Sequence, residues 1–224
     1  FRYEKNEQKL QGFDRTSLAP KPINVDVKTD DILPGINLTY FVNENTNLRF
    51  SASQTVSRPE LRELAPFGYV DFVTDGDVSG NPDLKSCLIQ NYDIRYEVFP
   101  AAGEILSFSA FYKNFNRPIE RVIVPTITTP APAYTFENAE DGAVNYGIEL
   151  EIRKNLGFIS KKLTNFLING NIAFINSQVD LQGTSSAGTE TKRRLQGQAP
   201  YAINLGIYYD NYDLGTSVNL LYNR

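Results

Sequence analysis

The sequence predicts an all-β fold in which long antiparallel strands each carry one apolar and one polar face. Residues 144–153 show this most clearly, because every second residue is apolar and the residues between are polar, charged or glycine. Residues 92–98 and 201–207 repeat the pattern. Side chains of a strand point alternately to opposite sides, so each segment predicts one apolar and one hydrated face of a sheet.

Composition narrows the classes of function. The 224 residues are 41% apolar and 21% charged, which is typical of a folded chain. The net charge of −4 predicts no nucleic-acid partner. Histidine is absent and Cys87 is the single cysteine, so the residues of most catalytic triads, zinc sites and internal disulfides are missing. We therefore expect no enzyme activity, no metal site and no bound cofactor.

The period-2 alternation predicts about nine strands. In chain order they lie near residues 1–11, 31–42, 46–56, 87–99, 104–115, 143–154, 163–180, 201–210 and 215–223. The connections alternate between short turns at residues 43–45, 100–103, 155–162 and 211–214 and long loops at residues 12–30, 57–86, 116–142 and 181–200. In an antiparallel sheet, this order places every short turn at one end of the strands and every long loop at the other.

The sorted connections favour a transmembrane β-barrel over a soluble β-sandwich. Outer-membrane barrels have short periplasmic turns and long extracellular loops. Their strands need roughly 9–11 residues to cross the hydrocarbon, whereas soluble strands cluster near five or six. The sequence contains no run of 18 apolar residues, so it predicts no membrane-spanning helix. Both ends of the chain fall inside predicted strands, and closed single-chain barrels have even strand numbers, so we expect a segment of a larger barrel.

The alternation also assigns the two faces of the predicted wall. Apolar residues such as Ile94, Ile148 and Leu150 are expected to face lipid, with tyrosines near the strand ends forming an interfacial girdle. The alternate positions carry charges that an apolar core would not tolerate unpaired, so we expect them to line a hydrated lumen. The candidate lumen residues are Arg49, Asp93, Arg95, Glu97, Glu149, Glu151 and Arg153.

Two segments of the long loop at residues 57–86 carry candidate ligand-contacting residues. Arg58 and Arg62 lie in a segment that either contacts a ligand or forms a short helix folded over the barrel mouth, and the helical interpretation is favoured. Asp83 ends the sequence Gly-Asn-Pro-Asp, whose residue types are typical of a tight turn. We retain Arg58, Arg62 and Asp83 as extracellular candidates, with loop architecture as the alternative.

Several blocks of the sequence resemble the TonB-dependent receptors. They are residues 55–67, 80–85 running into 91–97, 111–113 followed by 117–120, and 146–151, and their order and spacing also fit that family. The similarity is strongest to the Bacteroidetes-type branch, with its "SRP…LAP…GNPDL" loop. The resemblance implies a plugged barrel of about 22 strands in the outer membrane of a Gram-negative bacterium. Residues 1–224 would then be a C-terminal part of that barrel, without the plug, the TonB box or the last strands.

The resemblance also implies energy-coupled uptake of a bulky nutrient, such as a ferric siderophore, haem, cobalamin, an oligosaccharide or a peptide. The implied partners are the TonB inner-membrane energy complex, acting through the plug, the surrounding outer-membrane lipid and lipopolysaccharide, and in some members a surface lipoprotein. Two alternatives remain. One is a passive porin-like or lipid-transport barrel. The other is a soluble β-sandwich binding module, in which the face formed by Ile148, Leu150 and Ile152 would be buried.

Overall fold

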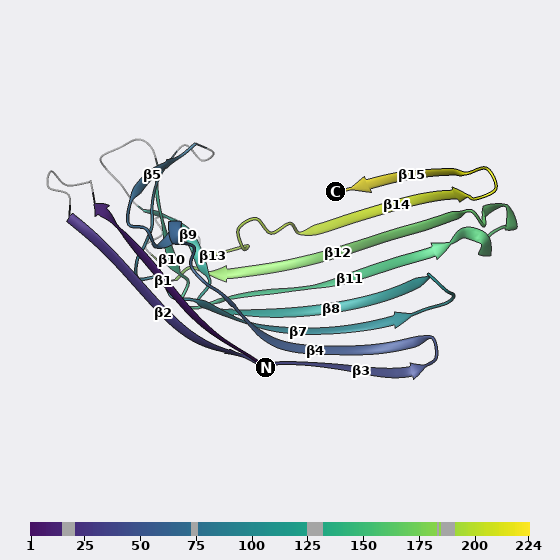
Figure 1. Ribbon diagram of the computed structural model, residues 1–224, viewed down its shortest axis with the longest axis horizontal. Coiled ribbons are helices and arrows are strands. Elements are labelled where there is room, and N and C mark those ends of the chain that lie inside the picture. The colour runs from purple at the N-terminus through teal and green to yellow at the C-terminus, as the bar shows by residue number, and fades with distance from the viewer. Residues whose placement is uncertain (15–20, 73–75, 125–131, 183, 185–190) are drawn as a thin grey trace.

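The computed structural model describes residues 1–14, 21–72, 76–124, 132–182, 184 and 191–224. Its main body is a strongly curved antiparallel sheet, which we call the wall (Figure 1). Strands of the wall follow the order β15-β14-β12-β11-β8-β7-β4-β3, and β13 adds to β12. Their bounds are β3 Gly35–Asn43, β4 Thr46–Ser57, β7 Cys87–Val98, β8 Ile105–Asn116, β11 Ala143–Asn155, β12 Phe166–Asp180, β13 Lys192–Arg193, β14 Tyr201–Asn211 and β15 Thr216–Asn223. The sheet is open between β3 and β15, so the described part is an unclosed barrel wall.

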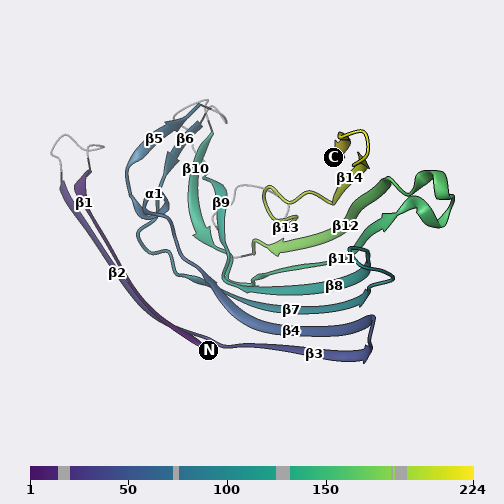
Figure 2. The ribbon, with the colours of Figure 1, turned by 45° about the vertical axis from the view of Figure 1, so that its right-hand side comes forward.

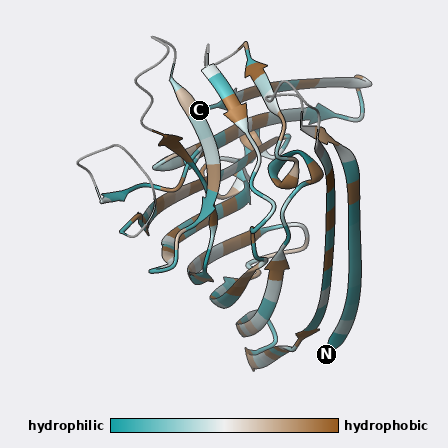
Figure 3. Cartoon of the chain, turned by 90° about the vertical axis from the view of Figure 1, so that its left-hand side faces the viewer, coloured by the Kyte–Doolittle hydropathy of each residue, from teal (hydrophilic) through white to brown (hydrophobic). Residues whose placement is uncertain are grey.

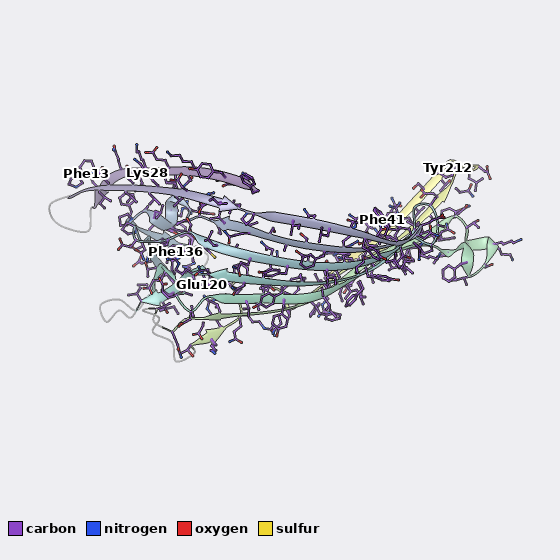
Figure 4. The ribbon with its side chains drawn as sticks, turned by 90° about the horizontal axis from the view of Figure 1, so that it is seen from below. Phe13, Lys28, Phe41, Glu120, Phe136 and Tyr212 are labelled. Atoms are coloured by element: carbon purple, nitrogen blue, oxygen red, sulfur yellow. The ribbon has the colours of Figure 1, made fainter. Side chains whose placement is uncertain are left out.

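The connections are sorted as the sequence predicts. The four short turns that the sequence predicts between strands lie at one end of the wall, called here the turn end, where Figure 4 labels Phe41 and Tyr212. The other end, called the loop end, carries a four-stranded sheet, the short helix α1 and a two-stranded sheet (Figures 1 and 2). Their bounds are β5 Gly68–Asp71, β6 Gly76–Ser79, β9 Ile119–Val124, β10 Ala133–Asn138, α1 Leu61–Leu64, β1 Arg2–Asp14 and β2 Lys21–Leu33.

Four sequence-based predictions about the elements need correction. The long loops predicted at residues 57–86, 116–142 and 181–200 contain the short strands β5, β6, β9, β10 and β13, which pair with one another or, in the case of β13, with β12. The sequence predicts a loop over residues 12–30, but residues 21–33 form β2, which pairs with β1 outside the wall. The single strand predicted over residues 31–42 is interrupted at Pro34, which has no N–H to donate to a ladder. The strand predicted from residue 163 begins at Phe166, because Lys161–Leu163 form a 3₁₀ turn.

The pairing register places the alternating residues on the two predicted faces. Tyr92, Tyr112 and Tyr146 are direct neighbours on β7, β8 and β11 and form one row of the apolar face. Large side chains on this face are exposed, with Ile148 at 41% and Leu150 at 47%. The alternation of hydrophobic and hydrophilic residues along the wall is visible in Figure 3. The face that a soluble β-sandwich would bury is therefore not covered by a second layer of the described chain.

Most of the buried apolar residues lie at the loop end. Ala139, Ala143, Val179 and Leu181 form a small core, against which Phe115 and Leu195 pack. Leu64 and Val78, from α1 and β6, are almost completely inaccessible to solvent. No helix among the described residues is long and apolar enough to cross a membrane.

Candidate functional site: the charged face and the loop end

A network of charged side chains crosses the charged face, which is the face of the wall opposite the apolar one, in the half nearer the turn end. Register places Arg49 opposite Arg95, a contact of like charges that would be unfavourable alone. Glu97 resolves it, because its two carboxylate oxygens accept from Arg49 Nε at 2.7 Å and from Arg95 Nε at 2.8 Å. Arg95 Nη2 also binds Glu151 Oε2 at 2.6 Å. Four of the seven candidate lumen residues thus form one ion-pair network spanning β4, β7 and β11.

The side chains of the other three candidates on this face make no hydrogen bond or ion pair within the described part of the chain. Asp93 and Glu149 line a hollow of about 360 Å³ that includes Arg95, Ser109, Phe111, Lys113 and Asn145. Arg153 follows Glu151 on the same face, toward the turn end. The charged face therefore divides into a paired band and a set of charges that are free to meet water or a bound molecule.

Arg58 joins the loop of residues 57–86 to the two-stranded sheet. Its guanidinium binds Glu4 Oε2 at 2.7 Å and Asp31 Oδ2 at 2.6 Å, one residue from each strand of the sheet. Beside it, Gln8 Nε2 donates to the carbonyl of Pro59 at 2.9 Å. The hydrogen bond and ion pair from Arg58 hold the pKa of the Glu4 carboxyl below its ordinary value. In this arrangement both terminal nitrogens of Arg58 are committed to protein carboxylates.

Arg62 and Asp83 are more accessible. Arg62 lies on α1, the short helix that the sequence predicts in this loop, with its guanidinium carbon 5.2 Å from the centre of the Tyr69 ring. Asp83 is exposed, and its backbone N–H donates to Asn81 Oδ1. A Cβ on Gly80 would lie 2.3 Å from the carbonyl oxygen of Ala65, so the turn requires glycine there. The Gly-Asn-Pro-Asp segment therefore anchors the loop, and Asp83 projects from it.

Two charged contacts at the loop end are not predicted by the sequence. Glu120 on β9 is 5% exposed and pairs with Arg193 of β13. Burial raises the pKa of the Glu120 carboxyl above its ordinary 4.5, although Arg193 acts in the opposite direction. Arg121 binds Asp71 Oδ2 at 2.8 Å and lies 4.0 Å from the centre of the Tyr134 ring. No local pattern signals these pairs, because the partners are 50 or more residues apart.

The described residues contain no group of three or more His, Cys, Asp or Glu side chains that could hold a metal ion. Cys87 is free and buried. In the basic segment at residues 192–194, Lys192 pairs with Asp180 and Arg193 with Glu120, so two of its three charges are matched within the chain. The charged face can bind a solute non-covalently, because it presents charged groups, amides and aromatic rings. Its paired carboxylates link neighbouring segments of the chain.

Comparisons with known proteins place this wall in a family. An iron-regulated outer membrane virulence protein of Vibrio cholerae is 35% identical over 98 residues, which is 41% of this chain and 15% of that protein. The hemophore receptor HasR of Serratia marcescens, solved with its hemophore and heme, superposes with a TM-score of 0.68 at 9% identity, over 99% of this chain and 39% of that one.

The siderophore receptor PirA of Pseudomonas aeruginosa superposes with a TM-score of 0.61 at 12% identity, over 91% of this chain and 37% of that one. The chain thus spans well under half the length of the relatives it matches. The family model of the TonB-dependent receptor-like β-barrel matches all of residues 1–224. The chain belongs to the TonB-dependent receptor β-barrel family.

Proposed function

We propose that this chain forms part of the wall of a Gram-negative outer-membrane receptor for energy-coupled uptake of a bulky nutrient. The observation that carries the proposal is the exposed apolar face of the wall. On β11 this face runs over the nine residues from Tyr146 to Lys154, and a tilted transmembrane strand needs roughly 9–11 residues. The apolar band of a transmembrane barrel is about 25 Å tall and is bounded by aromatic residues.

Aromatic residues stand at both edges of this band. Tyr92, Tyr112 and Tyr146 form the row nearer the loop end, and Asn176 Nδ2 donates to the Tyr146 hydroxyl at 2.6 Å. At the turn end, the rings of Phe166 and Tyr209 pack with their centres 4.8 Å apart. A phenol keeps its ring in the apolar layer and its hydroxyl in water, so these rows support a wall set across a bilayer.

The charged face suits the lumen of such a wall. Its paired band compensates the charges of Arg49, Arg95, Glu97 and Glu151, of which Glu97 alone is buried. Asp93, Glu149 and Arg153 would then meet a plug or a passing solute. Energy would come from the TonB complex through the plug of the whole receptor. The receptor would sit among outer-membrane lipid and lipopolysaccharide, and a surface lipoprotein is a further proposed partner.

For the nutrient, we favour an iron carrier, a ferric siderophore or haem, over cobalamin, an oligosaccharide or a peptide. The relative from Vibrio cholerae is named as an iron-regulated outer membrane protein, and it shares 35% identity with this chain over the matched residues. The "SRP…LAP…GNPDL" loop supports placing the chain in the Bacteroidetes-type branch of the family. The proposed ligand-facing residues are Arg62 and Asp83, because Arg58 is already engaged by Glu4 and Asp31.

The test begins with the location of the intact protein and continues with its transport activity. We expect recovery in the outer-membrane fraction, and we expect a deletion strain to lose growth on a ferric siderophore or haem as sole iron source. A protonophore should abolish uptake of the radiolabelled iron carrier. Recovery as a soluble protein would overturn the membrane assignment. Uptake that persists with the protonophore would instead favour a passive barrel.

A further inference from the structure

The apolar face carries a hollow of about 460 Å³ that extends from β7 to β14 and is lined in part by Gly170 of β12. Register places Gly170 between Ile152 of β11 and Leu205 of β14, whose side chains approach each other over the glycine. Leu150 and Phe108 line the same hollow. A Cβ on Gly170 would approach the Leu205 Cδ2 atom to 2.8 Å, so the side chains around the site are already close.

Basic residues lie nearer the turn end than this hollow. Lys154 follows Ile152 on the apolar face, where it pairs with Glu104 and lies 5.5 Å from the centre of the Phe158 ring. Lys161 and Lys162 occupy the adjoining turn, are exposed and have no ion pair within the described residues. In the same turn the side chain of Phe158 is 68% exposed. The turn thus offers an aromatic ring and two free ammonium groups beside the apolar face.

The spacing of these features fits within one leaflet of a bilayer. Gly170 lies four residues from Phe166, the first residue of β12, which is roughly 13 Å along the strand and about 9 Å of depth for a strand tilted by about 45°. One leaflet contributes about 15 Å of hydrocarbon. An acyl chain that starts at the level of the lysines therefore reaches the hollow without leaving its leaflet.

We propose that the hollow at Gly170 and the lysines of the β11–β12 turn form a binding site for one anionic phospholipid of the leaflet at the turn end. The acyl chain lies in the hollow, against Phe108, Leu150 and Gly170, and the phosphate is bound by Lys161 and Lys162. Charge complementarity selects an anionic headgroup over a zwitterionic one. The site rests on the proposed function only in requiring that the wall crosses a bilayer.

Native mass spectrometry of the protein extracted from outer membranes in a mild detergent tests the site, with phosphatidylglycerol and phosphatidylcholine as probes. We expect phosphatidylglycerol to be retained in preference. K161E/K162E should lower its retention roughly fivefold for each lysine, or about 1 kcal/mol each. G170L, which fills the hollow, should lower it at least about threefold through lost van der Waals contact. K85E, an exposed lysine at the loop end, is the matched control and should change nothing.

Equal retention of the two lipids, or equal losses in K161E/K162E and K85E, would overturn the site. A dimer in place of the lipid adduct would also overturn it, because a second copy would then occupy the hollow. If G170L fails to reach the membrane, the lysine variants alone decide the question, because Lys161 and Lys162 lie outside the wall strands.

Quenching by brominated lipids separates this proposal from the membrane assignment. The chain has no tryptophan, so L150W and F158W each add a signal that is read as a difference from the parent protein. Loss of quenching at L150W in reconstituted protein would overturn the membrane assignment. Quenching at L150W with no preference for phosphatidylglycerol would overturn the lipid site alone. We expect both variants to be quenched, F158W more by bromines near the headgroup.

Discussion

In the wall, large apolar side chains such as Ile148 and Leu150 are exposed, whereas at the loop end Leu64, Val78 and Val179 are almost completely buried. The wall is held mainly by ladder hydrogen bonds between long neighbouring strands. The loop end is held by its own small core and by ion pairs between distant segments, such as Arg58 with Glu4 and Asp31. The wall therefore leaves its large apolar side chains exposed, whereas the loop end buries them within the chain.

This difference in the exposure of apolar side chains indicates the surroundings in which each region is stable. A sheet that exposes isoleucine and leucine along its full length is stable only where the surroundings are also apolar. The loop end buries its apolar side chains within the chain, as a segment in water must. We infer that the loss of stability caused by a mutation depends on the region in which it lies. Matched pairs of variants can measure this dependence.

The largest expected effect is at the loop end. Leu64 on α1 is fully buried, so Leu64→Ala should cost about 2–5 kcal/mol through lost contacts and a residual cavity. Leu61 on the same helix is 52% exposed, and Leu61→Ala is the matched control, with an expected cost below about 1 kcal/mol. Hydrogen exchange should show lost protection in residues 57–86 with the wall unchanged. Equal loss of protection in β7 and β8 would contradict the separation of the two regions.

In the wall, a charge should be costly on one face only. Leu150→Arg places a cation on the apolar face and should lower stability in lipid vesicles by roughly 2–4 kcal/mol at mid-bilayer depth. Glu149→Arg changes the adjacent residue, on the charged face, and should cost under about 1 kcal/mol. Guanidinium unfolding of both variants in vesicles measures the difference. Similar losses for the two variants would mean that the apolar face does not contact lipid.

On the charged face, removing a charge from the paired band should lower stability more than removing a charge that has no partner. Glu97→Gln leaves Arg49 and Arg95 opposite each other without their shared carboxylate, and we expect a loss of about 1–2 kcal/mol. The expected loss is modest because Arg49 is about half exposed and is screened by water. Asp93→Asn removes a charge that has no partner in the described chain and should be nearly neutral. A double-mutant cycle with Arg49→Gln would show no coupling if the network contributes nothing.

The wall is predictable from the sequence because its pattern is local. Tyr146, Ile148 and Leu150 alternate within one strand, and each neighbour repeats the same period, so face and strand can be assigned without knowledge of contacts. Strand β2 carries a weaker version of this signal in the alternation of Ile23, Val25 and Val27, which does not stand out within a predicted long loop.

The loop end is not predictable in the same way. The parallel pairing of β6 with β10 and the contact of Glu120 with Arg193 join segments far apart in the chain, and no periodicity encodes them. The candidate site residues follow the same division. Alternation places Asp93, Arg95 and Glu149 on one face, as the structure does, whereas the partners of Arg58 can be learned only from the structure.

The smallest predicted effect is a change with pH at the link between Arg58 and the two-stranded sheet. Because Arg58 lowers the pKa of Glu4 below its ordinary 4.5, the link contributes stability above about pH 4.5 and loses it as the pH falls through the folded-state pKa. Hydrogen exchange of residues 2–13 should therefore accelerate in acid while β7 and β8 remain protected. Glu4→Gln should show fast exchange at every pH, because the charge that Arg58 binds is gone. A parent protein whose exchange here is independent of pH, after correction for intrinsic rates, would show that the loop end is held by its core alone.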